Sequence, residues 1–166
     1  MTLAEAAAHA QQLAEAGDER ALADLRRQWD DEVEAAVRDS DYRVRALGFR
    51  AIAQFRFRQK LALLERGLED ESPACRGSAL VAFESLSREH PAAVNSVRRV
   101  LHELASHDGN EAVRRLAILC LKNGSAQRDT QVLLEGLAQD DEQSRELRDT
   151  ARKVAQLLAK KARAKP

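Results

Sequence analysis

Four arginines recur along the chain at intervals that suit a row of binding groups. Arg45, Arg76, Arg114 and Arg148 follow one another at steps of 31, 38 and 34 residues. A guanidinium is permanently charged and forks onto phosphate or carboxylate oxygens, so such a row could follow a polyanion. Each arginine, however, directly follows an apolar residue and stands three positions before a small one. We therefore expect each to bond to a neighbouring loop carbonyl or capping residue.

The only tryptophan of the chain stands beside carboxylates. The run Trp29-Asp30-Asp31-Glu32 places an aromatic face next to negative charge, which could hold a cationic base. A single Trp and the single Tyr42 cannot line the aromatic pocket that a base-excising enzyme needs. We expect Trp29 to pack in the hairpin between two helices, with Asp30 or Asp31 capping the next helix.

The histidines and cysteines suggest no ligand set. The four histidines show no pairing with Cys or carboxylates at ligand spacing, and no glycine-rich phosphate loop is present. Cys75 and Cys120 fall on the apolar faces of predicted helices, where free cysteine behaves as a small hydrophobe. The sequence thus predicts no catalytic residue, no metal and no cofactor, and favours a binding protein over an enzyme.

The strongest candidate for a binding surface is the segment 43–58. Phe49 and Phe57 would lie on a second apolar stripe of one helix, flanked by Arg50 and Arg56. Aromatic rings bordered by arginine are typical of the hot spots of protein interfaces. The sequence leaves one alternative equally open, in which Phe49 or Phe57 packs against the N-terminal segment.

Formal charge is balanced over the whole chain but uneven along it. Lys and Arg together number 27, as do Asp and Glu, yet residues 38–60 hold seven bases against two acids. Among the last 17 residues, all charged side chains are basic. Such patches could contact nucleic acid, although cations at a helix C-terminus also suit the helix dipole. Nucleic-acid binding through residues 43–60, the basic tail and Arg115 is therefore the alternative function.

The elements that must position these residues are helices. Strong helix formers (Ala, Leu, Arg, Glu and Gln) dominate, whereas the β-branched and aromatic residues that favour strands are scarce. The sequence predicts an all-α fold. No stretch approaches the roughly 20 apolar residues of a membrane span. Two cysteines are too few for a disulfide framework, so we expect a cytoplasmic protein.

Four of the predicted helices start with the same motif. A capping residue is followed three positions later by an apolar residue and then by the arginine. Small residues three positions beyond the arginine should let neighbouring helices approach, and further apolar residues mark one helix face. Shorter amphipathic helices lie near 61–68, 91–104 and 132–138. The capping residues are Asp41, Ser72, Asn110 and Ser144, and the small residues are Gly48, Ala79, Ala117 and Ala151.

This repeated pattern resembles HEAT repeats, with armadillo-type and phycobilin-lyase-type repeats as close relatives. The resemblance covers about residues 31–160. It implies a right-handed α-α superhelix of about four to five helical hairpins, formed as one domain over residues 1–166. Residues 1–30 would be atypical capping helices, near 2–16 and 19–28, and residues 161–166 a basic tail. In such families an acid and the arginine form a ladder between repeats, which Asp41 and Arg45 could start.

The resemblance also shapes the expected function. HEAT-like scaffolds most often bind proteins, a few bind DNA, among them alkylpurine glycosylases, and some handle bilins. We expect a non-enzymatic scaffold or adaptor that holds a protein or peptide along the concave face of the capped helices. Nucleic-acid binding is the alternative, and a glycosylase-like or bilin-lyase-type enzyme the third. The expected partner-binding residues are Phe49, Arg50, Phe57, Arg115, Lys122 and Arg152.

Overall fold

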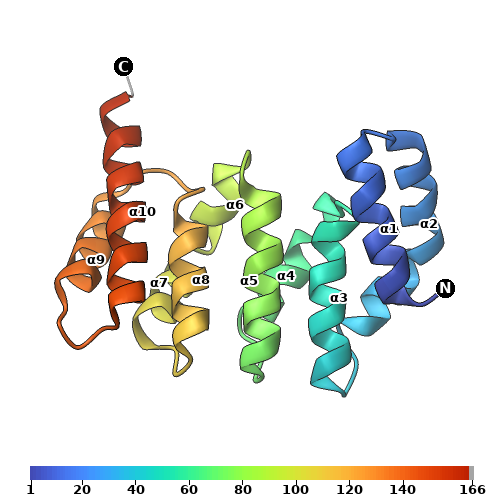
Figure 1. The fold of residues 1–166 in the computed structure, drawn as a ribbon, viewed down its shortest axis with the longest axis horizontal. Coiled ribbons are helices and arrows are strands. Elements are labelled where there is room, and N and C mark those ends of the chain that lie inside the picture. Colours follow the sequence, from blue (N-terminus) through green and yellow to red (C-terminus); the bar gives the residue numbers. More distant parts are fainter. Residues whose placement is uncertain (165–166) are drawn as a thin grey trace. The chain divides into compact units, whose positions relative to one another are not determined.

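The chain folds entirely into helices. The structure is a computed structural model that describes residues 1–164, and over this range it contains ten α-helices, one short 3-10 helix and no strand (Figure 1). The predicted all-α class is confirmed. Lys165 and Pro166, the end of the predicted basic tail, lie outside the described residues. Over residues 1–164, no helix has both the length and the apolar content needed to cross a membrane.

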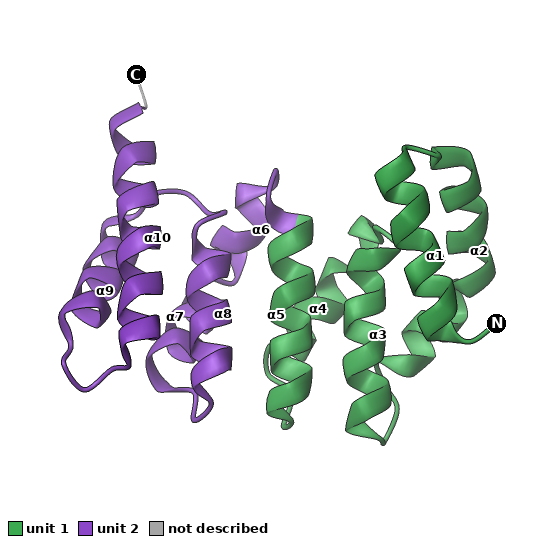
Figure 2. Cartoon of the chain, in the orientation of Figure 1, with its two compact units in different colours: residues 1–86 green, residues 87–166 purple. Residues whose placement is uncertain are grey.

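Two compact units make up the chain, Met1–Leu86 and Ser87–Pro166 (Figure 2). The first contains α1 (Leu3–Ala16), α2 (Glu19–Ala36), α3 (Tyr42–Gln54), η1 (Arg58–Lys60) and α4 (Leu61–Gly67), and most of α5 (Pro73–Ser87). Helices α1 and α2 pack against each other and both contact α3, which in turn contacts η1 and α4. The second unit contains α6 (Pro91–Ser96), α7 (Arg98–His107), α8 (Glu111–Leu121), α9 (Arg128–Gln139) and α10 (Arg145–Ala164), with α7 packed on α8 and α9 on α10.

The second helix is longer than predicted. The sequence predicts a helix near 19–28 and a boundary between cap and repeats at residue 30, but α2 continues without a break to Ala36. Buried residues recur along it at steps of three and four, from Leu22 to Trp29 and Val33, so one apolar face runs through the expected boundary. Asp30 and Asp31 consequently lie inside α2, and the prediction that one of them caps a helix is wrong.

The helix predicted around 91–104 is instead two helices. Val97 stands between α6 and α7 with φ −116° and ψ 15°, outside the helical region. Next to this break, the Asn95 side chain exchanges two hydrogen bonds with Ser125, donating to the hydroxyl at 2.8 Å and accepting from the backbone N–H at 3.1 Å. The α8–α9 loop is thereby held on α6, a contact that the local pattern does not reveal.

The predicted helix starts are confirmed where their caps are described. The side chains of Asp41, Asn110 and Ser144 each accept a backbone N–H from the first turn, at 2.9, 3.1 and 3.1 Å. The predicted close approach at Gly48 is confirmed too. A Cβ added there would lie 2.9 Å from the Cβ of Ala36 and 3.0 Å from the Val37 backbone nitrogen, so α3 approaches the end of α2 closely at this glycine.

Candidate functional site

The repeated arginines serve the fold itself. In three of the four repeats the Nη1 group donates to the backbone carbonyl six residues earlier, in the loop that leads into the same helix. Each bond gives a loop carbonyl a charged hydrogen-bond donor. The predicted bond to a loop carbonyl is therefore confirmed for these three. The pairs are Arg45 with Asp39 at 3.0 Å, Arg76 with Asp70 at 2.9 Å and Arg114 with Asp108 at 2.8 Å.

The same loops contain a repeated aspartate that the sequence reasoning missed. Asp39, Asp70 and Asp108 each accept, through Oδ1, the backbone N–H two residues later, at 2.8 to 2.9 Å. These are Asx turns, in which a side chain imitates a backbone turn. The signal was present, because each aspartate stands six residues before its arginine. In the fourth repeat the corresponding aspartate is Asp140, which accepts the Glu142 amide at 3.0 Å but stands eight residues before its arginine. Arg148 there approaches Asp141 instead, at 3.8 Å.

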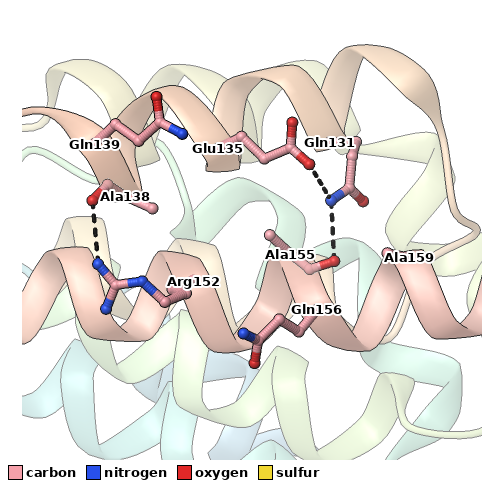
Figure 3. A pocket seen from close by; sticks show the side chains of 8 residues that line it. All are labelled: Gln131, Glu135, Ala138, Gln139, Arg152, Ala155, Gln156 and Ala159. Atoms are coloured by element: carbon pink, nitrogen blue, oxygen red, sulfur yellow. Dashed lines mark hydrogen bonds between the residues drawn. The ribbon is translucent and has the colours of Figure 1, made fainter.

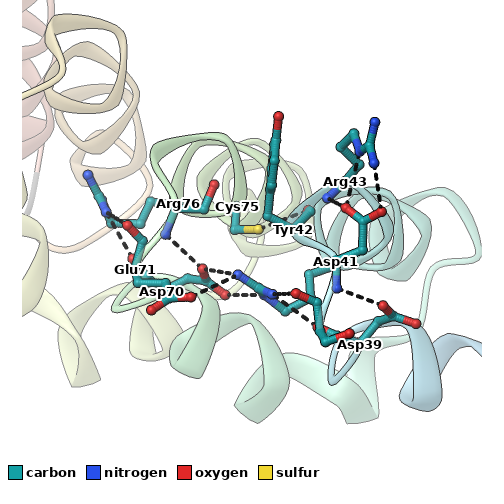
Figure 4. Close-up of polar contacts among 11 residues, drawn as sticks. Asp39, Asp41, Tyr42, Arg43, Asp70, Glu71, Cys75 and Arg76 are labelled. Carbon is teal, nitrogen blue, oxygen red and sulfur yellow. Dashed lines mark hydrogen bonds and ion pairs between the residues drawn. The ribbon is translucent and has the colours of Figure 1, made fainter.

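One of these aspartates also forms an ion pair across the first unit. Arg45 donates to Asp70 from Nε and Nη2, both at 3.0 Å, and both side chains are about nine-tenths buried. The surrounding turn is drawn in Figure 4. The expected pairing of Asp41 with Arg45 is wrong, since Asp41 pairs with Arg43 at 3.1 Å. Asp41 and Arg43 belong to the same helix start, whereas Asp70 comes from the α4–α5 loop and so links successive hairpins.

Hydrogen bonding determines the charge states of this pair. Burial alone would raise the pKa of Asp70, but the bonds from Arg45 and from the Ser72 amide bring that pKa below its usual range. The Asp70 carboxylate in turn raises the pKa of Arg45. Nearby, Cys75 donates its thiol to the Tyr42 carbonyl at 3.2 Å, and burial raises its pKa. Arg45 and Asp70 are thus both charged at neutral pH, and their ion pair has a structural role.

The aromatic stripe predicted on the surface of α3 is buried. Phe49 is 3% exposed and lies against α4, where a Cβ added to Gly67 would come within 2.8 Å of its ring. Phe57 is fully buried and stacks on Phe55, with ring centroids 5.4 Å apart. Neither ring is available to a partner, so the two are corrected to core residues. Phe57 also lies beyond the end of α3, so the prediction that one helix carries both rings is wrong. Arg50, which follows Phe49 on α3, is exposed.

The carboxylates beside Trp29 are occupied by a lysine. Lys60 is 5% exposed and donates its ammonium to Asp30 at 2.9 Å and Glu34 at 2.7 Å, with the Phe57 ring centroid 5.0 Å away. Burial would lower the pKa of Lys60, but the two carboxylates keep it above its usual value. The Lys60 bond lowers the pKa of Glu34. Trp29 is buried, and the cation beside it, held by Asp30 of this run and by Glu34, is therefore a side chain of the protein.

In the second unit, two of the predicted partner-binding residues contact neighbouring helices. Arg115 on α8 donates to Glu146 on α10 at 3.3 Å. Arg152 on α10 bonds to Asp149 at 2.7 Å and reaches the carbonyl of Ala138 on α9 at 3.4 Å. Lys122 directly follows α8, and its carbonyl accepts the Lys161 ammonium at 2.9 Å. Of the three, Arg152 lies in a groove.

That groove, which we call the α9–α10 groove, runs between the last two helices and has a volume of about 220 Å³ (Figure 3). Alanines form its apolar part, and longer polar side chains stand along both helices. Gln131 is already engaged, because its amide donates to Glu135 and to the Ala155 carbonyl, both at 3.0 Å. The lining residues are Gln131, Glu135, Ala138, Gln139, Arg152, Ala155, Gln156 and Ala159.

The chemistry of the α9–α10 groove suits hydrogen bonding rather than catalysis. Gln139 and Gln156 are exposed, and each amide offers both donors and an acceptor, the complement of a peptide group. Arg152 adds a cation and Glu135 an anion. Over residues 1–164, no group of three or more His, Cys, Asp or Glu side chains is placed to hold a metal ion.

Comparison of the chain with protein-family models, with curated proteins and with solved structures finds no match. The groove residues Glu135 and Gln139 were missed at the sequence level, since exposed Glu and Gln on an amphipathic helix carry no distinguishing signal there.

Proposed function

We propose that this protein is a HEAT-like helical-repeat scaffold, a short right-handed superhelix that binds an extended segment of another protein. The binding site would be the α9–α10 groove. Among the predicted partner-binding residues, Arg152 is part of this site, and Arg50, Arg115 and Lys122 are further candidates for partner contact.

The arrangement of amides over alanines is the observation that carries this proposal. An extended peptide exposes N–H and C=O groups that need partners once they leave water. Gln139 on α9 and Gln156 on α10 offer such partners from opposite walls of the groove. The side chains of Ala138, Ala155 and Ala159 are short, so a peptide backbone can come close to the helices. Charges at Arg152 and Glu135 would select the direction and sequence of the segment.

A displayed library of random peptides tests this function. We expect the protein to enrich a definable peptide motif and the double variant Gln139→Ala/Gln156→Ala to lose that enrichment. Gln11 and Gln54 provide a matched control, because they form an exposed amide pair in the first unit, 3.3 Å apart. The variant Gln11→Ala/Gln54→Ala should enrich the same motif as the parent. Equal enrichment by both double variants would refute the groove as the site.

A further inference from the structure

A second hollow lies in the first unit, where the end of α1, the start of α2 and the end of α3 meet. Its volume is about 630 Å³. Arginines form half of its lining, and one carboxylate opposes them, which leaves an excess of two positive charges (three minus one). The lining residues are Ala14, Glu19, Arg26, Arg56, Arg58 and Gln59. We call this hollow the arginine pocket.

The backbone at Arg56 shows that the arginine is placed there against local preference. Arg56 follows the end of α3 and has φ +57°. Its backbone N–H donates to the Ala53 carbonyl at 3.0 Å, and the N–H of Phe57 donates to the Ile52 carbonyl at 2.9 Å. This is a Schellman motif, whose left-handed position is usually taken by glycine. A side chain with a β-carbon is uncommon in that conformation.

The end of α1, in the same unit, has glycine at the equivalent left-handed position. Helix α1 ends in the same pattern of bonds, with Gly17 at φ +74° donating to Ala14 at 3.1 Å and Asp18 donating to Leu13 at 3.0 Å. Because glycine completes this turn without a side chain, the turn itself does not require the guanidinium of Arg56. Unfavourable backbone conformations of this kind cluster at binding sites, where a side chain must be placed.

The guanidiniums of the pocket are held in position but not neutralised. Arg26 donates Nη1 to the Phe55 carbonyl at 3.0 Å, and Arg56 donates Nη1 to the Ala53 carbonyl at 2.7 Å. A guanidinium has five N–H donors, so each keeps others for a ligand. Glu19, the acid of the lining, is 4.0 Å from Arg26 and its side chain is 76% exposed, which makes it a weak competitor. Arg58 is exposed at the rim.

We propose that the arginine pocket binds a small molecule carrying phosphate groups. Phosphate oxygens match the planar fork of arginine. A ligand with more than one negative charge is needed to pair with all three guanidiniums. The volume lies within the range of pockets for small ligands. This site is in the first unit and is separate from the proposed peptide groove of the second, so it adds a ligand that the proposed function does not need.

Calorimetric titration of the full chain with inorganic pyrophosphate tests the proposal. We expect saturable binding that weakens at least about tenfold in Arg58→Gln and in Arg56→Gly, and that falls as salt rises. Arg66→Gln is the matched control, because Arg66 is an exposed arginine of the same unit outside the pocket. It should bind pyrophosphate like the parent. Absence of binding, or equal weakening in Arg66→Gln, would overturn the site.

Thermal unfolding separates ligand binding from a structural role of Arg56. Glycine relieves the left-handed backbone, so we expect Arg56→Gly to melt at or above the temperature of the parent while losing pyrophosphate. A lower melting temperature with undiminished pyrophosphate binding would mean that Arg56 only caps α3, which would overturn its place in the site. Tighter binding of a single-stranded oligonucleotide than of pyrophosphate, lost in the same variants, would reassign the pocket to nucleic acid. The groove variant Gln139→Ala/Gln156→Ala should bind pyrophosphate normally, so the two proposals fail independently.

Discussion

Arg45 and Asp70 face each other across two successive hairpins of the first unit and share two hydrogen bonds of 3.0 Å. Arg45 also donates to two carbonyls of the loop before its own helix, those of Asp39 and Ser40. Asp70 accepts the Ser72 amide within its own loop. One ion pair therefore ties together two turns and two helix starts, which is how a motif that looks suited to binding becomes part of the architecture.

Replacing Asp70 by Asn should destabilise the first unit. The Asn oxygen can still accept the Ser72 amide, so the turn is kept, but Arg45 loses its buried counter-charge. Breaking a buried ion pair by removing one partner is strongly unfavourable, and we expect a loss of about 3 kcal/mol. Urea unfolding of the variant and the parent measures this difference.

The control for this change is Asp41→Asn. Asp41 also caps a helix and also pairs with an arginine, but its partner Arg43 is largely exposed. Asn is as good a cap as Asp, so we expect little change in stability. Equal losses in the two variants would contradict the distinction between the buried and the exposed pair.

Two glycines inside helices should respond to alanine in opposite directions. At Gly48 a Cβ would lie 2.9 Å from Ala36 Cβ and 3.0 Å from the Val37 backbone nitrogen, too close for an unaltered helix pair. We expect Gly48→Ala to lower the free energy of unfolding by about 1 kcal/mol or more, in spite of the better helix propensity. Gly136 has no atom within 4 Å of such a Cβ. There the propensity acts alone, and Gly136→Ala should gain about 0.5–1 kcal/mol. Thermal unfolding of both variants tests the pair, and a gain at Gly48 would show that α2 and α3 can separate without cost.

The features that the sequence predicted well are local ones. The caps at Asp41, Asn110 and Ser144 lie next to the amides they bond, and the arginine contacts its own loop six residues earlier. Gly48 indicates a close helix contact without showing which helix is the partner. Such signals need no knowledge of the tertiary structure.

The features that it did not predict depend on contacts between distant segments. Asp70 is 25 residues from Arg45, and nothing at the Arg45 helix start shows which aspartate will pair with it. Phe49 looks like a surface residue because α3 already has a complete apolar face, but α4 covers a second side of that helix. The arginine pocket was not predicted for the same reason, since Arg26 lies on α2 and Arg56 lies 30 residues later, just beyond the end of α3.

The buried lysine of the first unit should tolerate an apolar replacement better than a small one. Lys60 pairs with both Asp30 and Glu34, but these carboxylates are 43% and 44% exposed and can regain water when the ammonium is removed. Met keeps the volume of the Lys60 stem, so Lys60→Met should stay within about 1 kcal/mol of the parent. Lys60→Ala leaves a hollow beside the Phe57 ring and should cost about 2 kcal/mol. Chemical denaturation ranks the two variants, and a loss of about 3 kcal/mol or more in both of them would show that the charge itself holds the cluster together.

The second unit should lose stability as the pH falls through the range of histidine. His102 on α7 shares a hydrogen bond of 2.8 Å with the Thr130 hydroxyl on α9, and burial lowers the pKa of its imidazole. Asp129 opposes this shift and Arg98 adds to it. A His whose pKa is lower in the folded state binds fewer protons there than in the unfolded state. Stability contributed by the neutral imidazole is therefore complete above about pH 6.5 and is lost as the pH falls from there toward the folded pKa.

The variant His102→Gln isolates this effect, because glutamine can still bond to Thr130 but does not titrate. Carboxylates such as Asp70 also lose their contribution at low pH, since their pKa values are depressed in the folded state, but they do so equally in the parent and the variant. Urea unfolding at about pH 7.5 and about pH 5.5, on either side of the ordinary histidine pKa, gives the difference. We expect the parent to lose more stability between the two values than His102→Gln does. The same loss in both proteins would mean that the imidazole is not held in its neutral form by the α7–α9 contact.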